Sequence, residues 1–328
     1  MRNKKIVIVL IALFLLTGCT KQLTNVDGKV VKNETTGQVL PANILCQPTD
    51  KENIELYNQV KTDKEEKLKE DYENKKISKK EYDKKKSSLL DISKLPVCSK
   101  FKITSGGYEG LWMTIFIKPL TWFLIKLGIL LKNYGLSIII TTLIIRIVLY
   151  PLTQKTAKQS EVMKKLQPEI NKIEQKYKDK NDQQSMTLKS QELMMLYKKY
   201  NVNPMSGCIF GFLQVPLFFA FYESLYRLPA LFEDRFLIFD MSMTPLTAIT
   251  TGQIYYIILP LLVGLVTYFS FRANSANMGQ QSQMKTMTIV MMVLILVTSF
   301  SMSSAIILYW ITNSGFTIFQ NQFAKRRS

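Results

Sequence analysis

Hydrophobic residues in this chain form long blocks, separated by polar segments that are rich in lysine. Five blocks have roughly the length that a bilayer core requires, at about 133–151, 205–227, 254–271, 285–300 and 304–321. Only the residues SMSS separate the last two blocks, so we expect a tight antiparallel hairpin there. The pattern predicts an all-α polytopic membrane protein with a first transmembrane helix at 133–151 and four more within 205–323.

The segment 111–132, before the first block, has helical periodicity with a polar stripe. Its apolar residues recur at helical spacing: Trp112, Ile115, Phe116, Leu120, Phe123, Leu124 and Leu127. Lys118, Lys126 and Lys132 fall within about a third of the helix circumference. We therefore predict an amphipathic interfacial helix that lies flat on the outer leaflet and does not span it.

The loop 152–204 carries a coiled-coil seam. Its apolar residues step by 3, 4, 3 and 4 positions, at Met163, Leu166, Ile170, Ile173 and Tyr177. The segment DKNDQQ (179–184) interrupts the pattern, which resumes at Leu193, Leu196 and Tyr200. This spacing predicts an antiparallel helical hairpin whose seam is internal packing and whose basic outer faces are left for partners.

Net charge is +18, and its distribution predicts the topology. Loop 152–204 contains eleven lysines against six acidic residues, and the tail 324–328 is also basic. The segment 228–253, on the other side, contains one arginine against three acidic residues. Because Lys and Arg accumulate in cytoplasmic loops, the hairpin and the C-terminus are predicted to be cytoplasmic, in a bacterial cell membrane.

The N-terminus has the features of an export signal. A basic start (MRNKK) precedes a short apolar core and the sequence LTGC, which ends at Cys19 and resembles the lipobox of bacterial lipoproteins. The resemblance implies removal of residues 1–18, lipidation of Cys19 and an extracytoplasmic polar region, 19–110. An ordinary signal anchor with a chance cysteine is the alternative.

Within that region, residues 51–86 are densely charged, with few apolar positions. This composition predicts a solvated helix or disorder, not a packed core. Cys46 and Cys98 flank the stretch in a compartment that permits disulfides. A disulfide and two free thiols are both compatible with the sequence.

The chain offers little for catalysis. It contains no His, no phosphate-binding glycine loop and no CxxC pair among its four Cys, so we predict no enzyme activity, no catalytic residues, no cofactor and no metal site. The predicted spans contain one carboxylate, Glu223, placed near the outer end of its span where it would reach the headgroups.

Arg146 is the only charged residue in the first span. A cation in hydrocarbon costs a few kcal/mol or more, so water or an anionic group has to hold it. It lies five residues before Pro151, and snorkelling to the headgroups is the alternative. A hydrated cavity around Arg146, open to a polar or acidic peptide, is the functional prediction.

Four segments together resemble one family: TTLIIRIVLYPLTQKT, the hairpin LQPEINKIEQKY…ELMMLYKKYNVNPMSGC, LQVPLFFAFYESL and LYWITNSGFTIFQ. In this order they resemble the YidC/Oxa/Alb membrane-protein insertases over roughly 111–323. The lipobox with a five-span core is similar to the Gram-positive, lipoprotein type of YidC.

The resemblance implies a hydrophilic groove, open to the cytoplasm and sideways to lipid. The matching substrate-groove positions are Arg146, Thr142, Gln214, Tyr309 and Trp310. Gln214 has a helix–helix hydrogen bond as its alternative role. Trp310 could be an interfacial belt residue, but it lies near the middle of its span.

The implied function is ATP-independent insertion and chaperoning of nascent membrane proteins, with membrane lipids as further partners and no DNA. The Sec translocon and the ribosome are candidate partners through loop 152–204 and the basic tail. The chain departs from the family pattern in three places. The tail NQFAKRRS is short, and the turn FSMSSA replaces the Phe-Pro-Ala-Gly of many relatives. The charged stretch 51–86 has no recognised counterpart.

Two alternatives belong to other functional classes. A small-anion transporter would use Arg146 as its binding site, but the unequal loops show no sign of inverted repeats. A lipoprotein scaffold with no transport role would leave Arg146 unexplained.

Overall fold

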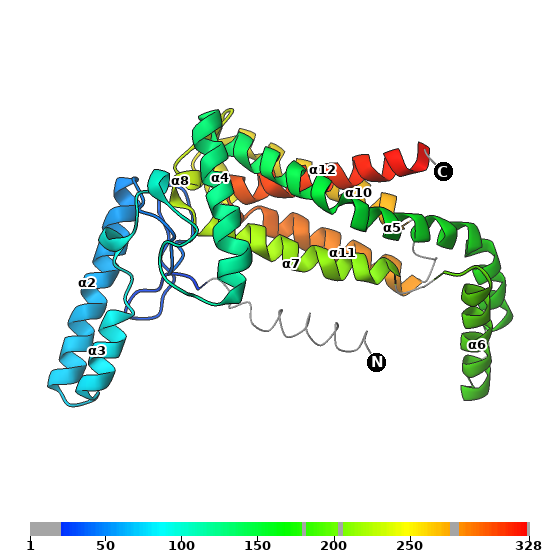
Figure 1. The fold of residues 1–328 in the computed structure, drawn as a ribbon, viewed down its shortest axis with the longest axis horizontal. Coiled ribbons are helices and arrows are strands. Elements are labelled where there is room, and N and C mark those ends of the chain that lie inside the picture. The colour runs from blue at the N-terminus through cyan, green and yellow to red at the C-terminus, as the bar shows by residue number, and fades with distance from the viewer. Residues whose placement is uncertain (1–20, 179–181, 203–205, 276–281, 327–328) are drawn as a thin grey trace. The chain divides into compact units, whose positions relative to one another are not determined.

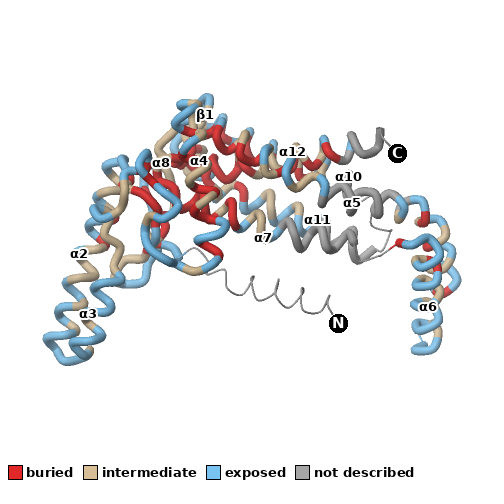
Figure 2. The backbone as a smooth tube through the Cα atoms, viewed as in Figure 1, coloured by how far each residue is buried: buried red, intermediate tan, exposed pale blue. Residues whose placement is uncertain are grey.

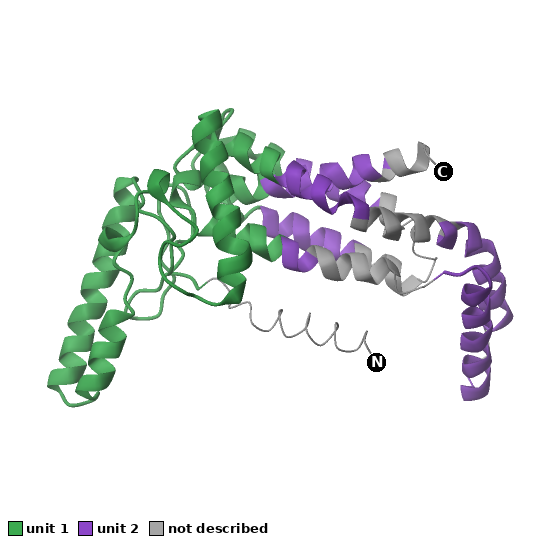
Figure 3. Ribbon diagram, in the orientation of Figure 1, with its two compact units in different colours: residues 1–141, 218–259, 300–308 green, residues 142–217, 260–299, 309–328 purple. Residues whose placement is uncertain are grey.

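The structure is a computed structural model that describes residues 21–178, 182–202, 206–275 and 282–326 (Figure 1). The chain divides into two compact units (Figure 3). Unit 1 contains residues 1–141, 218–259 and 300–308, and unit 2 contains residues 142–217, 260–299 and 309–328.

The N-terminal part of unit 1 is a small domain that combines short bridges with helices. Its helices are α2 (Lys51–Glu73), α3 (Lys79–Ser87), η1 (Ile92–Lys94) and η2 (Cys98–Lys100). Asp50 caps α2 and Ser78 caps α3 by accepting a backbone N–H in each first turn. In Figure 2, α3 is almost wholly exposed, and none of its residues is buried.

The prediction that the charged stretch 51–86 contributes to no packed core is wrong for the first half of α2. Tyr57 and Val60 of this helix lie in a small hydrophobic core with Leu23, Leu40 and Ile44. The two residues are three positions apart, so one helix face is buried while the rest stays charged and solvated. Low average hydrophobicity concealed this short apolar face.

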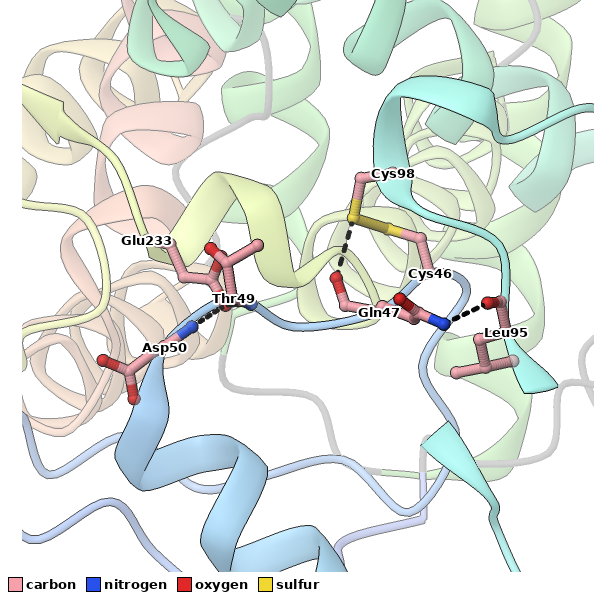
Figure 4. The surroundings of a disulfide bond; sticks show 7 residues. All are labelled: Cys46, Gln47, Thr49, Asp50, Leu95, Cys98 and Glu233. Carbon is pink, nitrogen blue, oxygen red and sulfur yellow. Dashed lines mark hydrogen bonds between the residues drawn. A yellow bond between two sulfur atoms is a disulfide. The ribbon is translucent and has the colours of Figure 1, made fainter. Parts of the chain in front are cut away.

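A disulfide joins Cys46 to Cys98, which decides between the two possibilities left open by the sequence (Figure 4). Beside it, the Gln47 side-chain amide donates to the Leu95 carbonyl at 2.8 Å. The Thr49 backbone N–H donates to the Glu233 carboxylate at 2.7 Å. The disulfide therefore lies where the small domain is attached to the segment that follows α7.

The helical part of unit 1 centres on the π-helical turn η3 (Met113–Ile117) and α4 (Lys118–Leu131), followed by the first two turns of α5 (Tyr134–Lys176). It also contains the end of α7 (Ser206–Tyr226), α8 (Pro229–Phe232), α9 (Pro245–Thr250) and η4 (Ile254–Ile257). A two-stranded antiparallel hairpin, β1 (Arg235–Phe236) and β2 (Phe239–Asp240), adds strand to a chain predicted to be all-α.

The polar stripe predicted for 111–132 is not a continuous solvated face. Lys118 is buried, and its ammonium group donates to the carbonyls of Ser105 and Gly107. Met113–Leu131 is also long and apolar enough to cross a membrane, as are Tyr134–Pro151 and Ile254–Arg272, within the described residues. Its interfacial placement stays a prediction.

The prediction that Glu223 reaches the headgroups from the outer end of its span is wrong. It is buried and accepts hydrogen bonds from the Trp112 indole at 3.0 Å and from Arg227 at 3.4 Å. Arg227 also forms an ion pair with Glu109 at 2.8 Å. Burial of these charges is tolerable because each has a partner.

Unit 2 holds the rest of α5, α6 (Gln183–Lys199), the first part of α7, α11 (Ser282–Ser299), and most of α10 (Ile258–Ser275) and of α12 (Ser304–Arg326). Helices thus occupy all the predicted spans. The first span and the first arm of the predicted hairpin form one continuous helix of 43 residues, which runs through Pro151 and Pro168.

The end of α5 packs against α6 through the predicted seam. Leu166 and Ile170 form a buried cluster with Leu196 and Val202, and Met163, Ile173, Leu193 and Tyr197 pack around it. Glu192 accepts from Lys176 at 2.6 Å and from the Tyr177 hydroxyl at 2.9 Å. Most of the seam residues therefore serve packing. Tyr200, which was predicted to continue the seam, is instead exposed, and its hydroxyl donates to the Glu169 carboxylate at 2.8 Å.

A close approach between α4 and α5 yields a stability prediction. A Cβ on Gly128 would lie 2.5 Å from ring carbons of Tyr134. Gly128→Ala should therefore destabilise unit 1 by about 1–3 kcal/mol, because the ring has to move. Thermal unfolding of the full chain in detergent measures the effect.

Gly315→Ala is the matched control for this prediction. Gly315 lies in α12 with no atom within 4 Å of an added Cβ, so its replacement should be neutral or slightly stabilising. Equal unfolding temperatures for the two variants would show that the contact at Gly128 does not constrain the fold.

Candidate functional site

Arg146 is the centre of the site in unit 2. It lies on α5, its exposed fraction is 4%, and its Nε donates a hydrogen bond of 2.7 Å to the side-chain oxygen of Asn313 on α12. The side chain is thus directed to a neighbouring helix and does not snorkel along α5 towards Pro151. The sequence predicted water or an anionic group as its partner, and the structure supplies a neutral amide.

Two predicted site residues lie close to this contact. Thr142 is buried one helical turn before Arg146, on the same face of α5. Tyr309 is fully buried on α12, one turn before Asn313, which accepts the hydrogen bond from Arg146. Thr142 and Tyr309 therefore each lie one helical turn from the contact between Arg146 and Asn313.

Trp310 has a different setting. It is half-buried, and its indole N–H donates to the hydroxyl of Thr267 on α10 at 3.0 Å. Thr267 is itself buried. The Trp310 indole therefore joins α12 to α10.

Sequence reasoning missed a polar row on α12. Asn313, Thr317 and Gln320 follow Tyr309 at steps of four, four and three residues, so they share one helix face. Thr317 and Gln320 are buried, and the Thr317 hydroxyl donates to the Asn313 carbonyl. The spacing of these polar residues in an otherwise apolar helix was the signal that could have found them.

The remaining candidate positions lie outside what the structure describes. Gln214 is on α7, but its side chain is not among the described residues. Cys19, the predicted lipidation site, also lies outside them. Within the described ranges, no group of three or more His, Cys, Asp or Glu side chains could hold a metal ion.

Electrostatically, the site differs from an ordinary buried ion pair. Among the described residues, no carboxylate lies within ion-pair distance of Arg146. An amide satisfies one N–H of the guanidinium without neutralising its charge. In a medium of low dielectric constant, such a charge attracts an anionic or strongly polar group over several ångströms.

Fold and site together define a helical integral membrane protein with a buried arginine that has no carboxylate partner among the described residues. Comparison with known proteins agrees. A family described as 60Kd inner membrane protein matches residues 126–328.

Several relatives carry the name membrane protein insertase YidC. One from Oceanobacillus iheyensis is 36% identical over 222 residues, which is 65% of this chain and 82% of the relative. One from Alkalihalophilus pseudofirmus is 38% identical over 221 residues, which is 66% of this chain and 82% of the relative. YidC 2 of Bacillus anthracis is 35% identical over 257 residues, which is 74% of this chain and 94% of the relative. This chain therefore belongs to the YidC/Oxa membrane-protein insertase family.

Proposed function

We propose that this protein is a membrane-protein insertase and membrane chaperone that acts on nascent hydrophobic segments. Family membership supports the general activity. The single observation that supports a mechanism is the buried Arg146, held by a neutral amide. A cation that was only structural would be expected to have a carboxylate partner at such a depth.

In the proposed mechanism, a nascent segment enters a hydrophilic groove from the cytoplasm. Arg146 attracts the polar or acidic end that has to cross, and keeps water within the membrane around it. Thr142, Gln214, Tyr309 and Trp310 line the groove. The barrier falls because the translocated end crosses a shorter width of hydrocarbon.

Release is sideways into lipid and needs no cofactor. Burial of apolar surface contributes about 25 cal/mol per Å² of the segment. The membrane potential contributes about 2.3 kcal/mol per elementary charge per 100 mV. No covalent step is required, which fits a site built from a guanidinium, hydroxyls and amides.

The proposed topology has five spans, a lipid-anchored N-terminal region outside the cell, and a cytoplasmic C-terminus. The hairpin formed by the end of α5 and by α6 then lies in the cytoplasm. Its exposed lysines, such as Lys172, are available for the Sec translocon or the ribosome. Nascent membrane proteins would reach the groove from this side.

Replacement of Arg146 tests the mechanism. Arg146→Ala should lower insertion of a single-span test protein with an acidic translocated end by about tenfold or more, because the attraction to the guanidinium is lost. A tenfold loss corresponds to only ~1.4 kcal/mol of attraction. A neutral end should lose less, and Arg146→Lys should keep much of the activity. Insertion into proteoliposomes is the assay.

Arg272→Ala is the matched control, because Arg272 is an exposed arginine at the end of α10. It should insert both substrates as the wild type does. Folded fractions must be equal, since loss of Arg146 leaves the Asn313 amide unpaired at a cost of about 1–3 kcal/mol. Equal activity of folded Arg146→Ala and wild type on the acidic substrate would refute the proposed role.

Processing at Cys19 is a second prediction. The intact mass of the purified protein should correspond to a chain that begins at Cys19 and carries lipid. Cys19→Ser should retain residues 1–18, because signal cleavage depends on prior lipidation of that cysteine. A wild-type chain that starts at Met1, or an unmodified Cys19, would contradict the prediction.

The position of the hairpin can be tested by labelling. Single cysteines at Lys172 and Lys189, in a Cys208→Ser background, should react with a membrane-impermeant thiol reagent only after cells are opened. A cysteine at Lys84, in the predicted extracytoplasmic region, should react in intact cells. Labelling of Lys172→Cys in intact cells would reverse the proposed topology.

A further inference from the structure

The hairpin of β1 and β2 has two aliphatic side chains at its tip. Leu237 is 78% exposed and Ile238 is 64% exposed. Leu237 is the most exposed large hydrophobic residue in the part of the chain that the structure describes. Two adjacent aliphatic residues held out from the protein need a partner that is itself apolar.

The turn conformation makes this choice of residues unusual. Leu237 and Ile238 form the two-residue turn between the paired residues Phe236 and Phe239. Leu237 has a φ of 56°, in the left-handed region. Hairpin turns with positive φ at this position usually contain Gly or Asn, which adopt it without strain. A leucine here is unfavourable for the turn itself.

The base of the hairpin is firmly held by the start of α5. The Asn133 side-chain amide donates to the Arg235 carbonyl at 2.9 Å, and the Tyr134 backbone N–H donates to the Asp234 carboxylate at 2.6 Å. Phe236 packs so closely on Gly135 that a Cβ there would lie 2.5 Å from the Phe236 side chain. The tip is therefore presented from a fixed base.

The second strand is held by the start of the segment that leads into α10. The Asp240 backbone N–H donates to the Tyr256 hydroxyl at 2.8 Å. The ring of Phe239 lies 5.2 Å from that of Tyr256 and 5.9 Å from that of Tyr255, centroid to centroid. The hairpin thus joins the first turns of two helical segments.

Both of these segments are candidate membrane spans, Tyr134–Pro151 and Ile254–Arg272. Because the hairpin contacts the first turn of each, both enter the membrane from the same face, and the hairpin lies at that face. Ile254, Ile257 and Ile258 are exposed beside it, as expected of residues that face lipid. The apolar surface of the tip lies next to an apolar surface that belongs in the bilayer.

We propose that Leu237 and Ile238 are a lipid-inserted anchor, seated in the interfacial region of the leaflet where α5 and α10 begin. Arg235, exposed at the base, is placed to meet lipid phosphates. Insertion of the aliphatic tip would offset the strain of the turn. The anchor would fix the outer ends of two spans relative to the membrane surface, independently of any role in insertion.

Depth-dependent quenching of a fluorophore tests the proposal in the full-length protein. A single cysteine at Ile238, in a Cys208→Ser background, is labelled with an environment-sensitive dye and reconstituted into phosphatidylglycerol/phosphatidylethanolamine vesicles. A label at Ile254 is the lipid reference and a label at Lys84 is the aqueous reference. Lipids brominated near the headgroup and iodide in water are the two quenchers.

The label at position 238 should be quenched by the brominated lipid to an extent close to that at 254, and should be shielded from iodide several-fold relative to position 84. Quenching by iodide alone, as at position 84, would overturn the proposal. Shielding from both quenchers would also overturn it, because a protein partner or a second copy would then cover the tip.

A second variant separates the anchor from simple folding. Leu237→Gly should raise the unfolding temperature in detergent, because it removes the strained φ while the base contacts stay intact. In vesicles, the same substitution should reduce the lipid quenching of a label at 238. Unchanged quenching in a well-folded Leu237→Gly protein would show that Leu237 does not hold the tip in lipid.

Discussion

The hydrogen bond between Arg146 and Asn313 is the interaction on which the proposed activity depends. It holds a guanidinium in the helix bundle at 4% exposure through a neutral amide, so the bond itself does not neutralise the charge. A carboxylate in place of the amide would make burial easier, but it would also cancel the positive potential. The same bond links α5 to α12, and Thr142 and Tyr309 lie one turn before it on the two helices.

A second buried arginine in unit 1 shows the contrast. Arg227 is 4% exposed, like Arg146, but it forms ion pairs with Glu109 at 2.8 Å and Glu223 at 3.4 Å. Arg227 connects residues from distant parts of the sequence, and its charge is compensated. At Arg227, two carboxylates accompany an arginine that connects parts of unit 1. The neutral partner of Arg146 is consistent with a site whose charge has to remain available.

Much of the fold could be predicted because hydrophobic periodicity is a strong signal. The apolar blocks became helices, and the 3,4 seam at Leu166 and Ile170 became a packed cluster. Arg146 was identified because one charge in an apolar segment has few explanations. The spacing of Tyr309, Asn313 and Thr317 was also present in the sequence, but polar residues of this kind occur in many spans.

The failures have physical causes of another kind. Lys118 and Glu223 were expected in water and at the headgroups because a charge is usually solvated. The contacts of Lys118 with Ser105 and of Glu223 with Trp112 follow no local spacing, so the sequence did not reveal them. Arg227, four residues after Glu223, was a local signal that could have indicated an ion pair. Tyr57 and Val60 were missed because a two-residue apolar face is lost in a charged helix. The β1–β2 hairpin was missed because Leu237 takes a backbone conformation that its residue type disfavours.

Insertion by an Asn313→Asp variant tests the central claim most directly. The substitution keeps nearly the same shape and hydrogen-bonding distance but pairs Arg146 with a carboxylate, so the positive charge is cancelled. Gln322→Glu, an equivalent change at an exposed position of α12, is the control. The measurement is the ratio of insertion rates for test proteins with acidic and neutral translocated ends. This ratio should fall towards one in Asn313→Asp and stay unchanged in Gln322→Glu. An unchanged ratio in a fully folded Asn313→Asp protein would show that the charge of Arg146 does not drive insertion.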